Sequence, residues 1–261
     1  MIEDQPTALA PRPEVRAFKA DLFAGRTVLV SGATSGIGLA IAQGFLELGA
    51  SVVATGSSQS KLDALETQGF GSGIRFAQLD VRSADDIKRF VERFDALDVL
   101  INAAGVARPW DEYRDDVFCE VLDINLTAAM RLSMAARPLL EKSQGSIINI
   151  ASMLSYIADV EVPAYCASKT GMLGLTRSLA HSMGIAGVRV NAIAPGYHRT
   201  NMTRALWEDP PKADKIAARS ALKRWGEVDD LVGAALFLAS PASAFITGVT
   251  LPVDGGYATG V

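Results

Sequence analysis

Ser152, Tyr165 and Lys169 are the residues whose types and spacing best suit acid–base chemistry. Tyr165 and Lys169 are four positions apart, so on a helix they share one face. A free tyrosine has a pKa of about 10, too high for a base near neutral pH, but an adjacent ammonium group favours the phenolate. Lowering that pKa to about 7 takes about 4 kcal/mol, which a lysine and a second positive charge can supply. The trio predicts proton transfer at a substrate oxygen, although such a tyrosine–lysine pair alone is common on solvated helices.

A glycine-rich turn follows the first predicted strand, between Ser31 and Gly38. Its glycines permit a tight turn and close backbone approach, and the next helix offers free N–H groups to a pyrophosphate. The spacing is GxxxGxG rather than the commoner GxGxxG, and a plain strand-to-helix turn is the alternative. A dinucleotide held here would bring a cationic nicotinamide, which is the second positive charge that a tyrosine base requires.

These features, with three further motifs, make the chain resemble the short-chain dehydrogenase/reductase family in its single-domain form, from about residue 22 to residue 257. The family's motifs match Ser31, Gly32, Gly36, Ile37 and Gly38; Asp80 and Val81; Asn102, Ala103, Ala104 and Gly105; the tetrad Asn125, Ser152, Tyr165 and Lys169; and Pro195, Gly196 and Thr200. Two positions depart from the family pattern: Ser31 stands where threonine is usual, and Ala103 replaces an asparagine.

The resemblance implies a role for each tetrad residue. Tyr165 would exchange a proton with the substrate oxygen, to which Ser152 would hydrogen-bond. Lys169 would lower the tyrosine pKa and hold the ribose hydroxyls, and Asn125 would anchor a water that continues the proton path. The residues expected at the cofactor are Ser31, Gly32, Ser35, Gly36, Ile37, Gly38, Ser57, Ser58, Asp80, Val81, Asn102, Ala103, Gly105, Tyr165, Lys169, Pro195, Gly196, His198 and Thr200.

The choice between NAD and NADP depends on the end of the second predicted strand. NAD-binding sites normally place an acidic residue there for the ribose hydroxyls, but the position holds Gly56. Ser57 and Ser58 offer donors to a 2′-phosphate, and Lys61 or Arg82 can help to neutralise it. Both cofactors stay open, and the balance favours NADP.

The substrate is expected to meet Ser152, Tyr165, Asp159 and Tyr197. Asp159 and Glu161 lie in the loop 153–163, where acidic groups suit hydroxyl-rich or cationic substrates and oppose carboxylates; alternatively, both face solvent. The family's 3-oxoacyl carrier-protein reductases dock their acidic partner with two arginines. Ser143 and Ala186 occupy those two positions here, which makes that function less favoured.

Three functions follow. The first is an NAD(P)-dependent dehydrogenase of a secondary alcohol, such as a sugar, polyol or related hydroxylated metabolite. The second is a carbonyl or 3-oxoacyl reductase that runs the same chemistry in reverse. The third is a cofactor-binding regulator without catalysis, which the intact tetrad opposes because a sensor has no need for these four residues together.

The elements that must position these residues alternate between short β-branched runs and longer helical patterns, which predicts an α/β fold. The expected architecture is a Rossmann-type, doubly wound, seven-stranded parallel sheet with helices on both faces, in a single domain at 23–261 after a flexible tail at 1–22. Predicted strands are 27–31, 51–55, 74–78, 99–102, 146–150, 188–192 and 250–253. Predicted helices are 36–48, 60–67, 84–93, 113–142, 164–183 and 228–238. The irregular stretch 197–225 predicts a substrate lid, or alternatively a surface helix pair.

Composition excludes several other classes. Of 261 residues, 49% are hydrophobic and the net charge is -4, which opposes nucleic-acid binding. Two cysteines, Cys119 and Cys166, form neither a disulfide framework nor a metal site, so no metal is expected. No apolar run is long enough to span a bilayer and no signal peptide begins the chain, so a cytoplasmic location and no membrane partner are expected. The resemblance implies a homotetramer formed through the helices at 113–142 and 164–183 and the C-terminal strand.

Overall fold

Seven parallel strands form one sheet in the order β3-β2-β1-β4-β5-β6-β7. The computed structural model describes residues 13–67 and 73–260. The strands are β1 (Thr27–Ser31), β2 (Ser51–Gly56), β3 (Ile74–Gln78), β4 (Val99–Asn102), β5 (Ser146–Ile150), β6 (Arg189–Pro195) and β7 (Thr250–Val253). Strands β2 and β3 are added on one side of β1, and strands β4 to β7 on the other. This change of side between β1 and β4 creates the crevice where such folds bind ligands. The predicted doubly wound α/β fold is confirmed.

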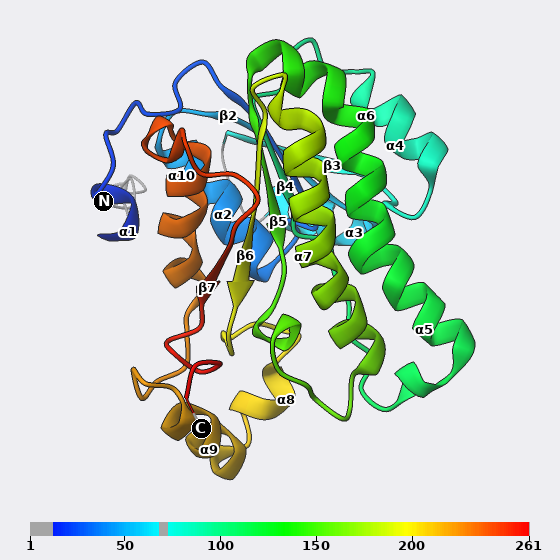
Figure 1. Ribbon diagram of the computed structural model, residues 1–261, viewed down its shortest axis with the longest axis vertical. Coiled ribbons are helices and arrows are strands. Elements are labelled where there is room, and N and C mark those ends of the chain that lie inside the picture. Colours follow the sequence, from blue (N-terminus) through cyan, green and yellow to red (C-terminus); the bar gives the residue numbers. More distant parts are fainter. Residues whose placement is uncertain (1–12, 68–72, 261) are drawn as a thin grey trace, which may run out of the picture.

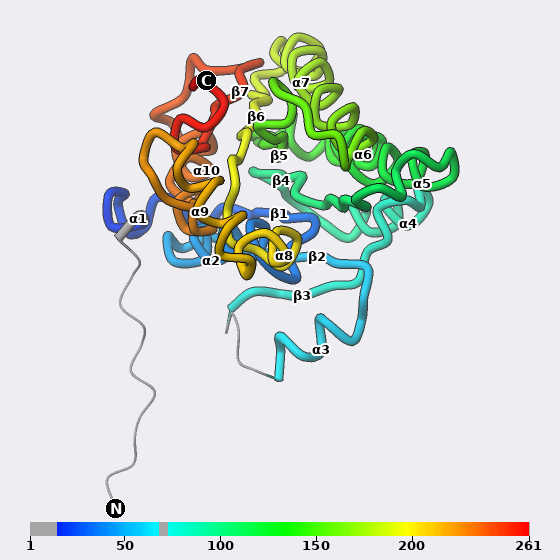
Figure 2. Tube along the Cα trace, turned by 90° about the horizontal axis from the view of Figure 1, so that it is seen from below, coloured from blue at the N-terminus to red at the C-terminus, as the bar shows by residue number. Residues whose placement is uncertain are grey.

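Helices cover both faces of this sheet (Figures 1 and 2). They are α1 (Pro13–Arg16), α2 (Gly36–Glu47), α3 (Gln59–Thr67), α4 (Ala84–Val91), α5 (Asp115–Leu122), α6 (Ala128–Ser143), α7 (Pro163–Gly184), α8 (Arg204–Trp207), α9 (Pro210–Arg219) and α10 (Val232–Ala239). Because side chains alternate along a strand, Val28 and Val30 pack toward α2 and α10, whereas Leu29 packs toward α4, α6 and α7. Burial on both faces explains why these strands are apolar throughout.

Most predicted bounds agree with the structure to within two residues, and two elements illustrate the larger differences. Strand β6 ends at Pro195 rather than residue 192, because Ala192 to Pro195 pair with β7. The single helix predicted over 113–142 is divided into α5, a π-helical turn at Asp123–Thr127, and α6. The π turn contains the buried Asn125, and such turns are frequent at functional sites.

Residues 13–22, which the sequence places in the tail before residue 23, pack against the body of the protein. Helix α1 contacts α10, Val15 is buried, and Phe18 and Leu22 pack against the same core. Apolar side chains at these positions give the segment a surface to bury. Residues 1–12 of the predicted tail lie outside the described residues.

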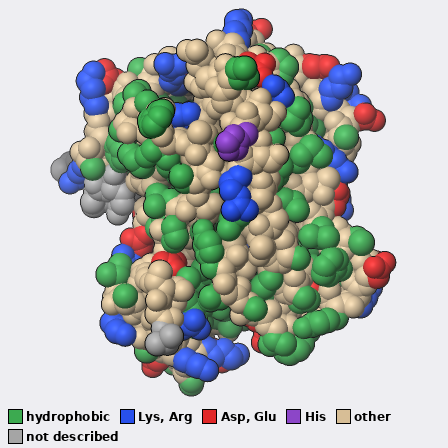
Figure 3. Space-filling view, viewed as in Figure 1, with side chains coloured by type: hydrophobic (Ala, Val, Ile, Leu, Met, Phe, Trp, Pro, Cys, Tyr) green, Lys and Arg blue, Asp and Glu red, His purple; other side chains and the backbone are tan. Residues whose placement is uncertain are grey.

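No helix in the described residues is long and apolar enough to cross a membrane. On the face that Figure 3 shows, most acidic and basic side chains are interspersed near the rim with hydrophobic groups between them, and one basic group lies beside a histidine nearer the centre. That face carries no continuous basic stripe of the kind that binds nucleic acid.

Candidate active site

A cavity at the carboxyl ends of the strands brings the glycine turn and the tyrosine–lysine pair together. Its lining residues are Gly32, Ser35, Gly36, Ile37, Gly38, Ala103, Gly105, Ile150, Tyr165, Lys169, Thr200, Asn201 and Met202. Gly32 has a φ of +70°, and a Cβ there would lie 2.5 Å from the Cα of Ala104. A Cβ on Gly38 would collide with the carbonyl oxygen of Gly32. The turn therefore exists only with glycine at these positions, and it leaves a backbone cradle at the start of α2 that fits a dinucleotide pyrophosphate.

Tyr165 and Lys169 lie one turn apart on α7, and Ser152 follows β5 on the neighbouring segment. The Lys169 Nζ lies 5.5 Å from the centroid of the Tyr165 ring and donates a 2.7 Å hydrogen bond to the Ile150 carbonyl. Ser152 accepts a hydrogen bond from the Leu154 amide at 3.1 Å and is hydrogen-bonded to the Tyr165 hydroxyl. The predicted trio is thus gathered at one place.

Burial determines the protonation of this pair in the protein alone. It raises the pKa of Tyr165 to about 12, while the hydrogen bond from Ser152 acts in the opposite direction. It lowers the pKa of Lys169 to about 8. In the protein alone, burial outweighs the groups that lower the Tyr165 pKa, because desolvating a phenolate is costly. The expectation that Lys169 acts together with a second positive charge stays a prediction. A further positive charge is needed.

Asn125 is fully buried and holds the loop after β4 against α7. Its Oδ1 accepts a hydrogen bond from the Val106 amide at 2.8 Å, and its Nδ2 donates to the Val106 carbonyl at 2.9 Å and to the Ser168 hydroxyl at 3.2 Å. The π turn brings this side chain between the two segments. Asn125 therefore fixes the position of the loop that carries Gly105, which itself lies close to Lys169.

The adenosine end of the crevice shows why Gly56 is a glycine. A Cβ at Gly56 would collide with the Cγ2 methyl of Thr34. Arg82 is already paired with Asp80, with its Nη2 2.7 Å from the Asp80 Oδ2, so both groups expected at the cofactor are engaged with each other. The Ser58 hydroxyl is 3.0 Å from that of Ser60, and Lys61 is exposed on α3.

Three other predicted cofactor residues have side chains engaged within the fold. The Ser31 hydroxyl is 3.4 Å from the Ile101 carbonyl, which links β1 to β4. Asn102 donates hydrogen bonds to Asn149 at 2.8 Å and to Ser133 at 3.1 Å. The His198 ring is buried against Gly226 and its Nδ1 is 3.1 Å from the Gly196 carbonyl. These side chains support the walls of the crevice, whereas Thr200 lines the cavity itself.

An aromatic cluster extends from Tyr165 toward the predicted lid. Tyr197 packs on Trp225 and Tyr257, with ring centroids 5.5 and 5.2 Å away. The Arg219 guanidinium lies over the Tyr257 ring at 4.5 Å. Burial, with the charges of Tyr257, Asp159 and Glu161, raises the pKa of Tyr197.

The two acidic residues of the loop 153–163 are half-buried rather than fully solvent-facing. Asp159 accepts a hydrogen bond from the Glu161 amide at 3.0 Å. Both carboxylates are near enough to affect the Tyr197 hydroxyl. The region beside the tyrosine cluster therefore carries acidic groups from one loop and the basic Arg219 from α9.

Glu112 is a site residue that the sequence does not reveal. It is fully buried, and its Oε2 accepts a 2.8 Å hydrogen bond from the Tyr165 amide. In the sequence it lies among the charged residues Asp111 to Asp116, which are typical of an exposed turn. Its neighbours therefore conceal its burial, and only the three-dimensional structure shows the contact.

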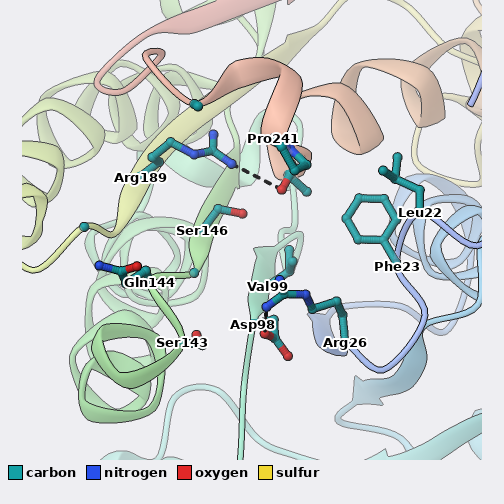
Figure 4. A pocket seen from close by; sticks show the side chains of 14 residues that line it. Leu22, Phe23, Arg26, Asp98, Val99, Ser143, Gln144, Ser146, Arg189 and Pro241 are labelled. Atoms are coloured by element: carbon teal, nitrogen blue, oxygen red, sulfur yellow. Dashed lines mark hydrogen bonds and ion pairs between the residues drawn. The ribbon is translucent and has the colours of Figure 1, made fainter.

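A larger cavity lies at the opposite, amino-terminal edge of the sheet (Figure 4). Its arginines are already bound: Arg26 to Asp98 at 2.6 Å, and Arg189 to the Leu238 carbonyl at 2.6 Å and the Ser243 hydroxyl at 2.8 Å. The cavity is remote from the motifs at the carboxyl ends. The Arg26–Asp98 pair joins the starts of β1 and β4, and Arg189 joins the start of β6 to the end of α10.

The fold and the cavity at the carboxyl ends of the strands together define a dinucleotide-binding oxidoreductase. A family model described as enoyl-(acyl carrier protein) reductase matches residues 32–258. The chain belongs to the short-chain dehydrogenase/reductase family, and it is an NAD(P)-dependent enzyme of that family.

The chain is similar to sugar-acid dehydrogenases and to 3-oxoacyl reductases. A 2-dehydro-3-deoxy-D-gluconate 5-dehydrogenase from Bacillus subtilis is 38% identical over 241 residues, covering 89% of this chain and 94% of the relative. A 3-oxoacyl-[acyl-carrier-protein] reductase from Vibrio cholerae is 36% identical over 239 residues, covering 89% and 97%. The structure of a gluconate 5-dehydrogenase from Burkholderia cenocepacia, in complex with NADP and tartrate, has a TM-score of 0.85, 33% identity, and coverage of 94% and 100%.

Proposed function

We propose that this enzyme oxidises a secondary alcohol of a sugar acid or a related polyhydroxylated metabolite, reversibly, with NADP as the preferred cofactor. The observation that carries the proposal is the presence of both acidic groups, Asp159 and Glu161, and the basic Arg219 around the aromatic cluster beside Tyr165, where the charges of all three act on Tyr197. Carboxylates accept hydrogen bonds from sugar hydroxyls, and a guanidinium binds a carboxylate. Arg219 thus removes the objection that acidic residues alone would repel a sugar acid.

The proposed chemistry assigns the proton to Tyr165. During oxidation the Tyr165 phenolate accepts the proton of the substrate hydroxyl and becomes the neutral tyrosine, and Ser152 hydrogen-bonds the same substrate oxygen. Lys169 is placed to bind ribose hydroxyls, and its positive charge favours the phenolate. When bound, the oxidised nicotinamide supplies the hydride acceptor and the further positive charge that Tyr165 requires. Asn125 keeps the Gly105 loop in position and, as the family resemblance implies, anchors a water on the proton path.

Substitutions of Arg219 and Asp159 should separate the two halves of substrate recognition. Arg219→Gln is expected to raise KM for gluconate by about tenfold, because one charge-assisted contact is worth about 1.4 kcal/mol or more, but to leave KM for an uncharged polyol unchanged. Asp159→Ala should lower kcat/KM for both substrates and leave the cofactor Kd alone. Steady-state kinetics on the two substrates measure both effects. Equal behaviour of Arg219→Gln on gluconate and the polyol would contradict a carboxylate site at Arg219.

The second candidate is a 3-oxoacyl reductase, which the similarity to the Vibrio cholerae enzyme supports. Ser143 and Ala186 leave it without the two arginines that dock the acidic carrier protein, so it ranks below the sugar-acid dehydrogenase. Comparing kcat/KM for gluconate and for a 3-oxoacyl thioester decides between them, and a higher value for the thioester would reverse the ranking.

The preference for NADP is expected to be modest, about tenfold in kcat/KM, equivalent to about 1.4 kcal/mol. Gly56 puts no acid against a 2′-phosphate, and Lys61 is the exposed cation on α3. Gly56→Asp should reverse the preference by charge repulsion, but its Cβ meets the Thr34 methyl. The test is therefore the double variant Thr34→Ser/Gly56→Asp, with Thr34→Ser as its matched control. A wild-type enzyme that strongly prefers NAD would contradict this account.

The proposal includes assembly and a lid. Met130 and Met134 are exposed on α6, and Phe245 is fully exposed before β7, so a homotetramer would remove this apolar surface from water.

Helices α8 and α9 form the proposed lid over 197–225, attached by the Trp207 indole to the Thr200 carbonyl at 3.0 Å. We assign the enzyme to the cytoplasm, where its two free cysteines stay reduced.

A further inference from the structure

Helix α7, which carries Tyr165 and Lys169, receives its N-terminal cap from a distant part of the chain. The residue at the N-cap, Val162, has no side chain that can accept a hydrogen bond, and the first turn of α7 contains no acidic residue. Glu112, fifty-three residues away, accepts the Tyr165 amide hydrogen bond at 2.8 Å instead. Its carboxylate also lies where the helix dipole favours negative charge.

The same carboxylate holds the segment that bears it. The Oε1 of Glu112 accepts a hydrogen bond from the Arg108 amide at 2.8 Å, so its two oxygens join the loop after β4 to the start of α7. Two further bonds join these segments: the Trp110 amide donates to the Glu161 carbonyl at 2.7 Å, and the Tyr113 hydroxyl donates to the Val160 carbonyl at 2.8 Å. We call the 3-10 turn Asp111–Tyr113 with these contacts the clasp.

Glu112 is the buried member of the clasp, and its position requires an explanation. A fully buried carboxylate is costly unless it is hydrogen-bonded. Among the described residues, no ion pair to Glu112 is seen within 4 Å, and its partners are backbone amides of the two segments that flank the reacting oxygen. If the position only had to be filled, an apolar residue of similar volume would fill it without the cost of burying a charge. The carboxylate is instead placed to orient Tyr165.

We propose that Glu112 is a positioning residue for the oxidoreductase reaction: it fixes the first turn of α7, and with it the Tyr165 hydroxyl, against the substrate loop 153–163. This inference rests on the proposed role of Tyr165 as the acid–base group. Glu112 also places a negative charge near that hydroxyl, which adds to burial in raising the Tyr165 pKa. Other titratable or charged groups around the clasp and Tyr165 include Arg108, Asp111, Glu120, Asp159, Glu161, Cys166 and Lys169.

The test uses the full-length enzyme and three variants. Glu112→Gln removes the charge and one acceptor, Glu112→Asp keeps the charge but is too short to span both amides, and Asp111→Asn makes the same charge change on the exposed neighbour in the same turn. For each variant, kcat, KM, the NADPH Kd, Tm and the pH profile of alcohol oxidation are measured.

For Glu112→Gln we expect kcat to fall by about tenfold or more, with an unchanged NADPH Kd, and the rising limb of the pH profile to move to lower pH, because loss of the negative charge lowers the Tyr165 pKa. For Glu112→Asp we expect a lower kcat, because the shorter side chain cannot span both amides, and a wild-type pH profile, because the charge is kept. Asp111→Asn should match the wild type in every measurement.

Either variant alone can overturn the inference. A Glu112→Gln enzyme with a wild-type pH profile would show a merely structural role, as would a Glu112→Asp enzyme with unchanged kcat if the glutamine variant does not fold. A Tyr165→Phe enzyme that stayed active would overturn the proposed chemistry together with this inference. An inactive Tyr165→Phe enzyme beside unaltered Glu112 variants would overturn the inference alone.

Discussion

Replacing Tyr165 by phenylalanine is expected to lower kcat by about a thousandfold while leaving the Kd for NADPH within about twofold, because general acid–base catalysis by one group contributes a factor of this order. The substitution removes the hydroxyl that bonds to Ser152 and keeps the ring that packs in the cluster with Met153 and Val162. The cavity that receives the dinucleotide stays intact. Initial rates of NADPH formation and a fluorescence titration of NADPH measure the two quantities.

A matched control for this variant is Tyr156→Phe. Tyr156 lies on the neighbouring substrate loop 153–163, with 48% of its surface exposed, and no proton transfer is assigned to it. Its kcat should equal that of the wild type. If Tyr165→Phe retained even about a tenth of the wild-type kcat, Tyr165 could not be the acid–base group, since that corresponds to only about 1.4 kcal/mol.

Gly32→Ala should have the second largest effect, this time on cofactor binding. The Cβ would lie 2.5 Å from both the Cα and the N of Ala104, and the φ of +70° disfavours any L side chain. The contacts are with backbone atoms, so the turn and the loop after β4 must separate. We expect the NADPH Kd to rise by at least about tenfold and Tm to fall, because misplacing the pyrophosphate cradle removes several hydrogen bonds.

Gly174→Ala provides the comparison for this variant. Gly174 lies within α7, and a Cβ there meets nothing within 4 Å. Alanine in a helix interior is favoured over glycine by about 1 kcal/mol, so this variant should bind NADPH normally and melt slightly higher. Thermal unfolding and NADPH titration of both variants test the argument. Equal NADPH affinity in Gly32→Ala and the wild type would show that the turn does not contact the cofactor.

The features that follow from local pattern were predictable from the sequence. The residue types of apolar strands such as Val28–Val30 indicate burial, and the glycines of the first turn indicate a tight backbone turn. The sheet and the cavity beside Tyr165 could therefore be predicted from them. The π turn at Asn125 was not predictable, because its sequence continues the helical pattern of α5 and α6.

Contacts between distant segments were beyond the reach of sequence patterns. Glu112 looks like one member of an exposed acidic run, and only the fold brings it to the Tyr165 amide. The Thr34 methyl that excludes a side chain at Gly56 lies in a different turn. The pKa of Tyr165 is raised because its hydroxyl is buried, and the spacing of Tyr165 and Lys169 gives no information about that burial.

Transfer of deuterium from substrate to cofactor tests the central claim most directly. The enzyme is incubated with NADP⁺ and a polyhydroxy acid deuterated at its carbinol carbons, and the reduced cofactor is examined by mass spectrometry. We predict one deuterium on the nicotinamide ring in the wild type, with the Tyr165→Phe enzyme transferring it about a thousandfold more slowly. A wild-type enzyme that binds NADP⁺ but transfers no deuterium from this acid, a polyol or a simple secondary alcohol would contradict the account and favour a cofactor-binding regulator.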